Sequence, residues 1–173
     1  ENPHQKGRFI GNINDYITQL SCKDISYNNL LDIVSSLDLL VDLKSKKSIF
    51  LLHKHTNPCG VAIRDSLLEA YEDALSCDNV SAFGGILTSN RAIDRISASQ
   101  IDKLFFEILI APAFDDEALT ILKSKKHRII ITLNQIPSKS IQSRSCLNGF
   151  LEQDVDLSLL QLSDPPSRTP TLY

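Results

Sequence analysis

The segment LLHKHTNPCG, residues 51–60, concentrates side chains that can do chemistry. A neutral imidazole takes up and returns protons near neutral pH, and a lysine ammonium supplies fixed positive charge. Lys54 and His55 are therefore candidates for an acid–base pair. Two other interpretations stay open, which are a metal site built on the two histidines and a polar loop that only ends a strand.

The metal interpretation depends on the spacing of His53 and His55. Histidines two residues apart lie on the same side of an extended chain, so an HxH pair can share a zinc ion, with Cys59 as a further candidate. A catalytic zinc takes three protein ligands, and the neighbouring Lys54 ammonium disfavours a dication. We therefore expect no metal here, and we expect Cys59 to be a packing residue because no neighbouring group indicates an activated thiol.

Two further segments can contribute to a pocket. SAFGG, residues 81–85, has adjacent glycines that let a backbone approach a flat ligand closely, although this segment alone favours a tight turn into the next strand. It matches no phosphate-binding motif. Glu107 gains a functional interpretation only if it faces the same pocket as His55.

The elements that must position these residues follow from the apolar pattern. It predicts helices beginning at Ser26, Ser66, near Ser97 and at Asp115, and strands over residues 8–13, 48–52, 84–89, 107–112 and 128–133. RSCLNGFLEQDVD predicts one more strand and a turn. Alternating strands and helices favour parallel strands with crossover helices. The predicted class is α/β, a three-layer α/β/α sandwich with a mainly parallel sheet.

In parallel sheets, ligands bind beyond the carboxyl ends of the strands. HKHTNPCG follows the strand over 48–52, SAFGG leads into the strand over 84–89, and IAPAFDDE follows the strand over 107–112. We expect these three segments to lie on one rim of the sheet.

Composition excludes several classes of protein. The chain has 173 residues and a net charge of −3, without a dominant basic patch, so nucleic-acid binding has no electrostatic support. Its apolar runs are far shorter than a membrane span. The polar start ENPHQKGRF is not a signal peptide, so a cytoplasmic location is expected.

The cysteines and methionines bear on compartment and completeness. Four widely spaced cysteines without a CxxC motif indicate a reducing compartment rather than a disulfide framework. The sequence contains no methionine. We therefore expect it to be a piece of a longer protein.

Several long segments are distinctive in combination: ENPHQ, ISYNNLLD, HKHTNPCGVAI, SLLEAYEDALSCDNVSAFGGIL, FFEILIAPAFDDEALTIL and RSCLNGFLEQD. In this order they resemble the transformylase domain of the bifunctional purine-biosynthesis enzymes. That family combines AICAR (aminoimidazole carboxamide ribotide) transformylase with IMP cyclohydrolase, and the resemblance covers nearly the whole chain.

The resemblance implies transfer of the formyl group of 10-formyltetrahydrofolate to the 5-amino group of AICAR, without a metal. Lys54 and His55 match the family's Lys-His pair. The implied roles are proton acceptance from the amine by His55, and oxyanion stabilisation or leaving-group protonation by Lys54. The positions that match the implied substrate pocket are Asn57, Phe83, Gly84, Glu107, Ile110, Ala111 and Pro112.

The resemblance also implies an organisation. Residues 1–150 would form the first of two cytidine-deaminase-like halves of the transformylase region, and residues 151–173 a linker toward the second half. The family acts as a homodimer with active sites at the subunit interface. The second half, the cyclohydrolase domain and an Arg-Tyr pair that precedes ENPHQ in the family are missing, so weak activity or none is expected of this piece.

Two alternatives stay open. A catalytically inactive remnant or interaction module with the same fold would share every feature above. A zinc deaminase would share the fold, but it needs HxE and PCxxC motifs, which this sequence lacks.

Overall fold

The computed structural model describes residues 4–136 and 140–155. The chain divides into two compact units, Glu1–Pro137 and Ser138–Tyr173. The expected boundary after residue 150 falls within a strand of the second unit, and most of the expected linker, residues 156–173, lies outside the described residues. The organisation into two halves stays a prediction.

In the described part of the first unit, six strands form one sheet in the order β1-β6-β5-β4-β2-β3. Its elements are η1 (Ile13–Asp15), β1 (Ile17–Gln19), α1 (Tyr27–Leu43), β2 (Ser48–Lys54), β3 (Asn57–Arg64), α2 (Leu67–Cys77), β4 (Ile86–Ser89), α3 (Arg95–Ile101), β5 (Ile108–Ala111), α4 (Asp116–Lys123) and β6 (Ile129–Leu133). β4, β5 and β6 pair in parallel, whereas β2 pairs antiparallel with both β3 and β4, and β1 antiparallel with β6. Four of the six strands therefore run in one direction, and β1 and β2 run in the other.

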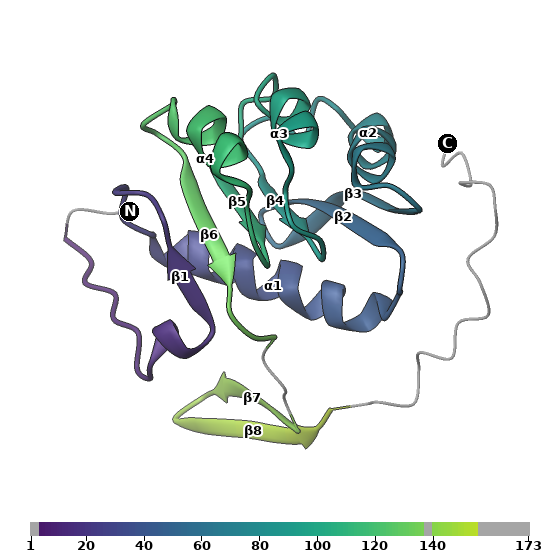
Figure 1. The fold of residues 1–173 in the computed structure, drawn as a ribbon. Coiled ribbons are helices and arrows are strands. Elements are labelled where there is room, and N and C mark those ends of the chain that lie inside the picture. The colour runs from purple at the N-terminus through teal and green to yellow at the C-terminus, as the bar shows by residue number, and fades with distance from the viewer. Residues whose placement is uncertain (1–3, 137–139, 156–173) are drawn as a thin grey trace. The chain divides into compact units, whose positions relative to one another are not determined.

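Helices cover both faces of this sheet, which confirms the predicted three-layer α/β/α class (Figure 1). α1 buries Ile33, Leu37 and Leu40 against one face, in a cluster with alternate residues of the strands. α2, α3 and α4 pack on the opposite face. β2, β4, β5 and β6 are buried on both faces, and for this reason their sequences are mainly apolar, whereas the outer strands β1 and β3 are partly exposed.

The helix starts follow from local sequence. Ser26 caps α1 and Ser66 caps α2, each in a capping box with the residue three positions later, Asn29 or Glu69. Each box satisfies backbone donors that a helix end leaves unpaired. The prediction of both helix starts is confirmed.

Two strand predictions are wrong. A strand was expected over residues 8–13, whereas the first strand is β1, at 17–19, where it finds β6 as a partner. The strands over 48–52 and 84–89 were expected to be parallel. They are antiparallel because β3, an unpredicted strand, forms a hairpin with β2 and reverses the chain before α2.

The position of β3 is fixed by its contact with α2. A Cβ atom on Gly60 would overlap the carbonyl oxygen of Ala74, so only glycine lets the strand lie this close to the helix. β3 also carries Pro58, which is tolerated because β3 is an edge strand.

The second unit contains a hairpin of β7 (Ile141–Cys146) and β8 (Gly149–Asp154), with every residue of both strands exposed. Among the described residues of the chain, no helix is both long enough and apolar enough to cross a membrane.

Candidate active site

The candidate acid–base pair lies at the tip of the β2–β3 hairpin. Lys54 is the last residue of β2 and pairs with Asn57, the first residue of β3, so that His55 and Thr56 form the turn. Both turn residues have positive φ, 54° and 61°, as in the type I′ turns that match the twist of a hairpin. HKHTNPCG was expected to be a loop after a strand, and it is instead a strand end, a two-residue turn and a second strand.

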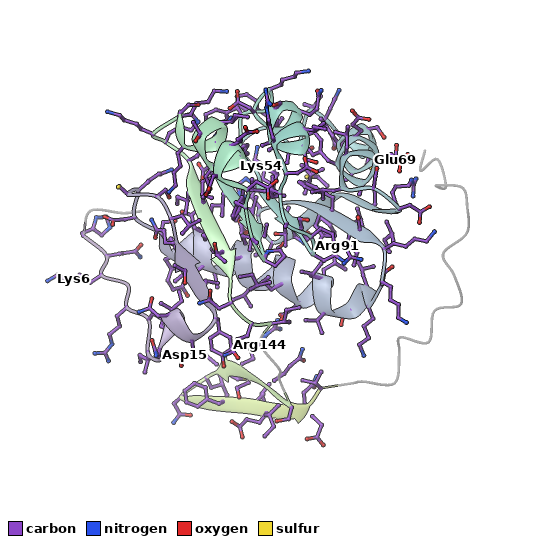
Figure 2. The ribbon with its side chains drawn as sticks, in the orientation of Figure 1. Lys6, Asp15, Lys54, Glu69, Arg91 and Arg144 are labelled. Carbon is purple, nitrogen blue, oxygen red and sulfur yellow. The ribbon has the colours of Figure 1, made fainter. Side chains whose placement is uncertain are left out.

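Lys54 is half-buried, and its side chain points to the face of the sheet covered by α2, α3 and α4 (Figure 2). Its Nζ donates a hydrogen bond to the carbonyl oxygen of Phe83 at 2.8 Å. This contact links the hairpin to the SAFGG segment. An ammonium has three donors, so one such bond orients the side chain without using its full capacity.

The strand register brings further predicted site residues to the same edge. His53 pairs with Ile86 at the start of β4, which in turn pairs with Ile108 at the start of β5. Because β2 runs antiparallel to β4, the carboxyl end of β2 lies beside the amino ends of β4 and β5. The hairpin turn, the SAFGG segment and Glu107 therefore meet at one end of the sheet, beside the amino ends of β4 and β5. We call this end the site edge.

Glu107 is half-buried immediately before β5. Its Oε2 accepts a hydrogen bond from Nδ2 of Asn29, on α1, at 3.1 Å. Its backbone donates to Gly85 and accepts from Ile129, which ties it into the sheet on both sides. The carboxylate is thus held at the site edge from two layers of the fold.

Three rings form a stack at this edge. Phe83, with 58% of its surface exposed, stacks on Phe105 with ring centroids 4.8 Å apart, and Phe105 stacks on His127 at 4.9 Å. Phe105 and His127 were not predicted as site residues. Each of the three rings precedes one of the parallel strands by two or three residues, and this shared offset is the signal that could have identified them.

Gly84 shapes the loop that carries Phe83. Its φ is +72°, a left-handed conformation that favours glycine, and its amide donates to the carbonyl oxygen of Phe105 at 2.8 Å. The glycine therefore holds the first two rings of the stack together through the backbone.

The remaining predicted pocket residues lie elsewhere. Ile110, Ala111 and Pro112 occur at the carboxyl end of β5, opposite to Glu107. The side chains of Ile110 and Ala111 have no exposed surface. The prediction of one shared rim is wrong for IAPAFDDE, because the hairpin places the carboxyl end of β2 at the amino ends of β4 and β5. A substrate contact by these three residues remains a prediction that this placement does not support.

His53 and Cys59 differ from the pair beside them. His53 is buried, with no hydrogen-bond partner for Nδ1, and burial lowers its pKa while the charge of Asp32 opposes the shift. Burial also raises the pKa of the Cys59 thiol, which packs on the core and donates to the carbonyl oxygen of Leu52. Within residues 4–136 and 140–155, no group of three or more His, Cys, Asp and Glu side chains could hold a metal ion.

A family model described as AICARFT/IMPCHase bienzyme matches residues 1–170. The chain belongs to this family. The bifunctional purine biosynthesis protein PurH of Bacteroides thetaiotaomicron is 47% identical over 164 residues, which cover 95% of this chain and 32% of that protein. The PurH proteins of Prochlorococcus marinus MIT 9301 and Petrotoga mobilis are 41% and 42% identical, over 95% and 90% of this chain and 34% and 31% of their own lengths.

The chain thus spans about a third of the length of these AICARFT/IMPCHase relatives. Membership in the AICARFT/IMPCHase family confirms the resemblance found from the motifs.

Proposed function

We propose that this chain carries part of the active site of an AICAR formyltransferase, which transfers the formyl group of 10-formyltetrahydrofolate to AICAR in purine (IMP) biosynthesis. The observation that supports it most is the meeting of Lys54 and His55, at the hairpin tip, with Phe83 and Glu107 at one sheet edge.

His55 is the proposed general base. The 5-amino nitrogen of AICAR attacks the formyl carbon, and the new C–N bond leaves the nitrogen with a surplus proton. The imidazole of His55, exposed at the hairpin tip, accepts that proton. The bond between the formyl carbon and N10 of the folate then breaks, and N10 leaves with a proton.

Lys54 is the proposed electrostatic residue. As the amine attacks, negative charge develops on the formyl oxygen, and a nearby ammonium stabilises it. The same ammonium can deliver a proton to the leaving nitrogen. Its hydrogen bond to Phe83 keeps it directed toward the ring stack rather than into solvent.

The other residues at this edge are proposed to bind substrate. Phe83 offers an exposed ring face to a planar heterocycle, and Gly84 lets the backbone approach it. Glu107 accepts hydrogen bonds from an amine or amide, and Asn57 lies beside His55 at the start of β3. No metal has a role in this scheme, and the two substrates are the only small molecules that it requires.

The wider proposal follows the family. The intact protein would act in the cytoplasm as a homodimer, and residues outside this chain would complete the pocket. The chain by itself is expected to turn over slowly or not at all, because an incomplete pocket loses the positioning that supplies much of an enzyme's rate.

The test is formyl transfer by the intact protein as its gene encodes it, comparing wild type with His55→Ala and Lys54→Ala. Each change should lower kcat at least about 100-fold, as expected for loss of a general base or of oxyanion stabilisation. Lys46→Ala, which removes an exposed lysine beyond the other end of β2, is the matched control and should leave kcat unchanged.

The second activity in the family description, the cyclohydrolase, supplies an internal control, and neither Lys54→Ala nor His55→Ala should lower it. Losses of less than about tenfold in formyl transfer for both variants would refute the assignment. Loss of the cyclohydrolase activity with formyl transfer intact would move these residues to the other reaction. Absence of formyl transfer by the wild-type protein would favour an inactive remnant or interaction module.

A further inference from the structure

One side of α1 carries three polar residues, Asn29, Asp32 and Ser35, which we call the α1 polar stripe. They are spaced by three, so their side chains emerge from neighbouring positions on the helix surface. The first two belong to the ISYNNLLD segment, to which the proposed mechanism assigns no role. Each of the three makes a hydrogen bond to a part of the chain that lies at the site edge.

Asp32 and Ser35 both contact the backbone of one turn residue. Oδ1 of Asp32 accepts a hydrogen bond from the amide of Thr56 at 2.6 Å, and Oγ of Ser35 donates to the carbonyl oxygen of Thr56 at 3.0 Å. The donor and the acceptor of the residue after His55 are thus both held by α1. Bonds to a carboxylate are stronger than bonds to a neutral acceptor, so Asp32 contributes most.

The turn needs such support because of its sequence. Type I′ turns favour Asn-Gly, whereas here His55 and Thr56 adopt the left-handed conformation. For a β-branched residue such as Thr56, a positive φ is a steric outlier. A conformation of this kind persists only when its surroundings impose it, and such residues cluster at active sites.

The carbonyl oxygen of His55 is held as well. It accepts hydrogen bonds from Oγ1 of Thr56 at 2.6 Å and from Nδ2 of Asn57 at 2.8 Å. The backbone around His55 is therefore fixed while its imidazole remains exposed. Asn29 applies the same principle to Glu107, whose carboxylate it orients from the first turn of α1.

We propose that Asp32 and Ser35 are positioning residues for His55, which clamp the backbone of Thr56 and thereby direct the imidazole to the edge that it shares with Phe83 and Glu107. This inference rests on the proposed function. It assigns to α1 the task of holding, in one rigid frame, a base in the β2–β3 turn and a carboxylate in the loop before β5.

The first experiment observes the clamp directly by NMR on the 173-residue chain. In the wild type, the Thr56 amide proton should resonate downfield and exchange slowly with solvent, because it is bonded to a carboxylate. Asp32→Ala should abolish both signatures, and Asp32→Asn, which keeps an acceptor oxygen, should retain slow exchange. Asp42→Ala, which removes an exposed carboxylate near the other end of α1, is the matched control and should change neither.

The second experiment measures kcat and KM for formyl transfer by the intact protein, at a temperature where circular dichroism shows every variant folded. Asp32→Ala should lower kcat about tenfold to 100-fold, while KM changes by less than about threefold, since a misplaced base affects the transition state more than binding. Ser35→Ala should show a smaller loss of the same kind, and it tests the clamp independently if Asp32→Ala does not fold. Asp32→Asn should restore most of the lost kcat.

A glycine in the turn provides a rescue that a merely structural role would not predict. Thr56→Gly favours the left-handed conformation without help from α1, so the double variant Asp32→Ala/Thr56→Gly should recover part of the kcat lost in Asp32→Ala. An unchanged Thr56 amide in Asp32→Ala would overturn the clamp. Loss of the amide signatures with wild-type kcat would overturn the positioning role. If the wild-type protein shows no formyl transfer, the proposed function fails and the role in that reaction fails with it, whereas the NMR result still decides whether the clamp exists.

Discussion

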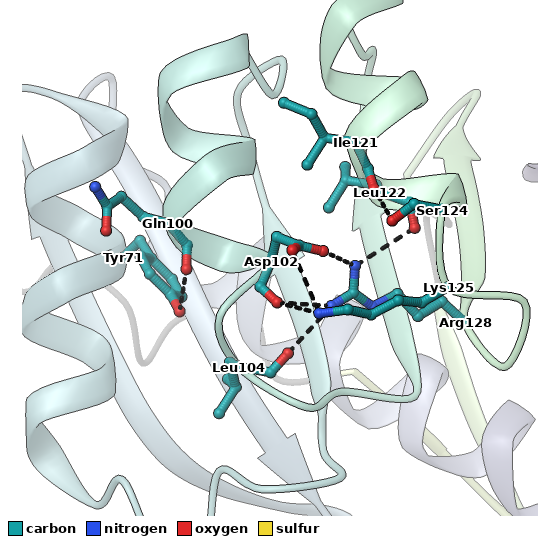
Figure 3. Close-up of polar contacts among 9 residues, drawn as sticks. All are labelled: Tyr71, Gln100, Asp102, Leu104, Ile121, Leu122, Ser124, Lys125 and Arg128. Carbon is teal, nitrogen blue, oxygen red and sulfur yellow. Dashed lines mark hydrogen bonds and ion pairs between the residues drawn. The ribbon is translucent and has the colours of Figure 1, made fainter.

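Two basic side chains lie at the same edge of the sheet and differ in almost every other respect. The side chain of Arg128, just before β6, has no exposed surface. Its guanidinium bonds to the carboxylate of Asp102 at 2.5 Å and to the carbonyl oxygens of Asp102, Leu104 and Leu122 (Figure 3). It also lies 4.2 Å from the centre of the Phe106 ring. Lys54, half-buried, makes its hydrogen bond to a single carbonyl oxygen.

The difference separates a structural cation from a functional candidate. Arg128 is compensated by a carboxylate and several carbonyls, and these bonds attach the loop before β5 to the start of β6. It thereby fixes the segments that carry Phe105 and His127. Lys54 sits at the tip of a hairpin with donor capacity to spare. Positive charge alone does not distinguish the two, but the number of partners and the exposure do.

The largest expected effect is on the structural cation. Asp102→Ala leaves the buried Arg128 without its carboxylate, and it should lower the free energy of unfolding by about 3–5 kcal/mol. Lys54→Ala should cost about 1 kcal/mol or less, because it removes one hydrogen bond of a half-buried side chain. Urea unfolding of both variants measures the contrast. Equal losses in the free energy of unfolding would show that Arg128 is not the structural cation and Lys54 the dispensable one.

A second, intermediate effect concerns two residues with positive φ at the site edge, Thr56 in the turn and Gly84 in the loop. Introducing a glycine at the first and removing the glycine at the second should change the stability of the fold in opposite directions. Thr56→Gly relieves a left-handed β-branched residue and should stabilise the fold by up to about 1 kcal/mol, after the entropy of the added glycine is subtracted. Gly84→Ala imposes a side chain at φ +72° and should destabilise it by about 1–2 kcal/mol. Thermal unfolding of the two variants tests this, and a destabilising Thr56→Gly would mean that the turn is not strained.

The smallest expected effect is on the pH dependence of stability, to which His53, beside Lys54, and Asp102, the partner of Arg128, contribute in different pH ranges. Burial lowers the pKa of His53, so the unfolded chain binds a proton near pH 6.5 that the folded chain does not, and stability should fall as the pH drops below that value. For Asp102, burial acts to raise the pKa, but hydrogen bonds and the charges of Arg128 and Lys125 outweigh it and lower the pKa. Its contribution is therefore present above about pH 4 and is lost as the pH falls through the lowered value.

Urea unfolding between pH 3 and pH 7 separates the two windows. His53→Leu should flatten the dependence just below about pH 6.5, and Asp102→Asn should change it only below about pH 4. An unaltered slope in His53→Leu would indicate that this histidine is protonated equally well in the folded and unfolded chains.

Much of the fold could be predicted because its signals are local. The capping boxes at Ser26 and Ser66 and the apolar runs of β2, β5 and β6 lie in contiguous sequence. β3 was missed because its turn, His-Thr, lacks the residues that favour a hairpin, and because Asn57-Pro58 resembles a loop.

Site residues could be predicted only where the residue type itself indicates chemistry. Lys54 and His55 stand out by residue type, whereas Phe105, His127 and the α1 polar stripe become relevant only through contacts with distant segments. The edge at which the site forms also depends on strand direction. The hairpin sets that direction, and the sequence pattern did not reveal it.

Two contacts fix the number of residues between the β2–β3 turn and the point where β3 meets α2. At the turn, α1 holds the backbone of Thr56, and four residues later Gly60 meets α2 in a space that admits no side chain. A single residue inserted between His55 and Thr56 would shift β3 by one position, turn its inward side chains outward and bring a bulkier neighbour against the Ala74 carbonyl. The hairpin should therefore tolerate an insertion in its turn less well than a substitution at an exposed position that neither holds the turn nor contacts α2.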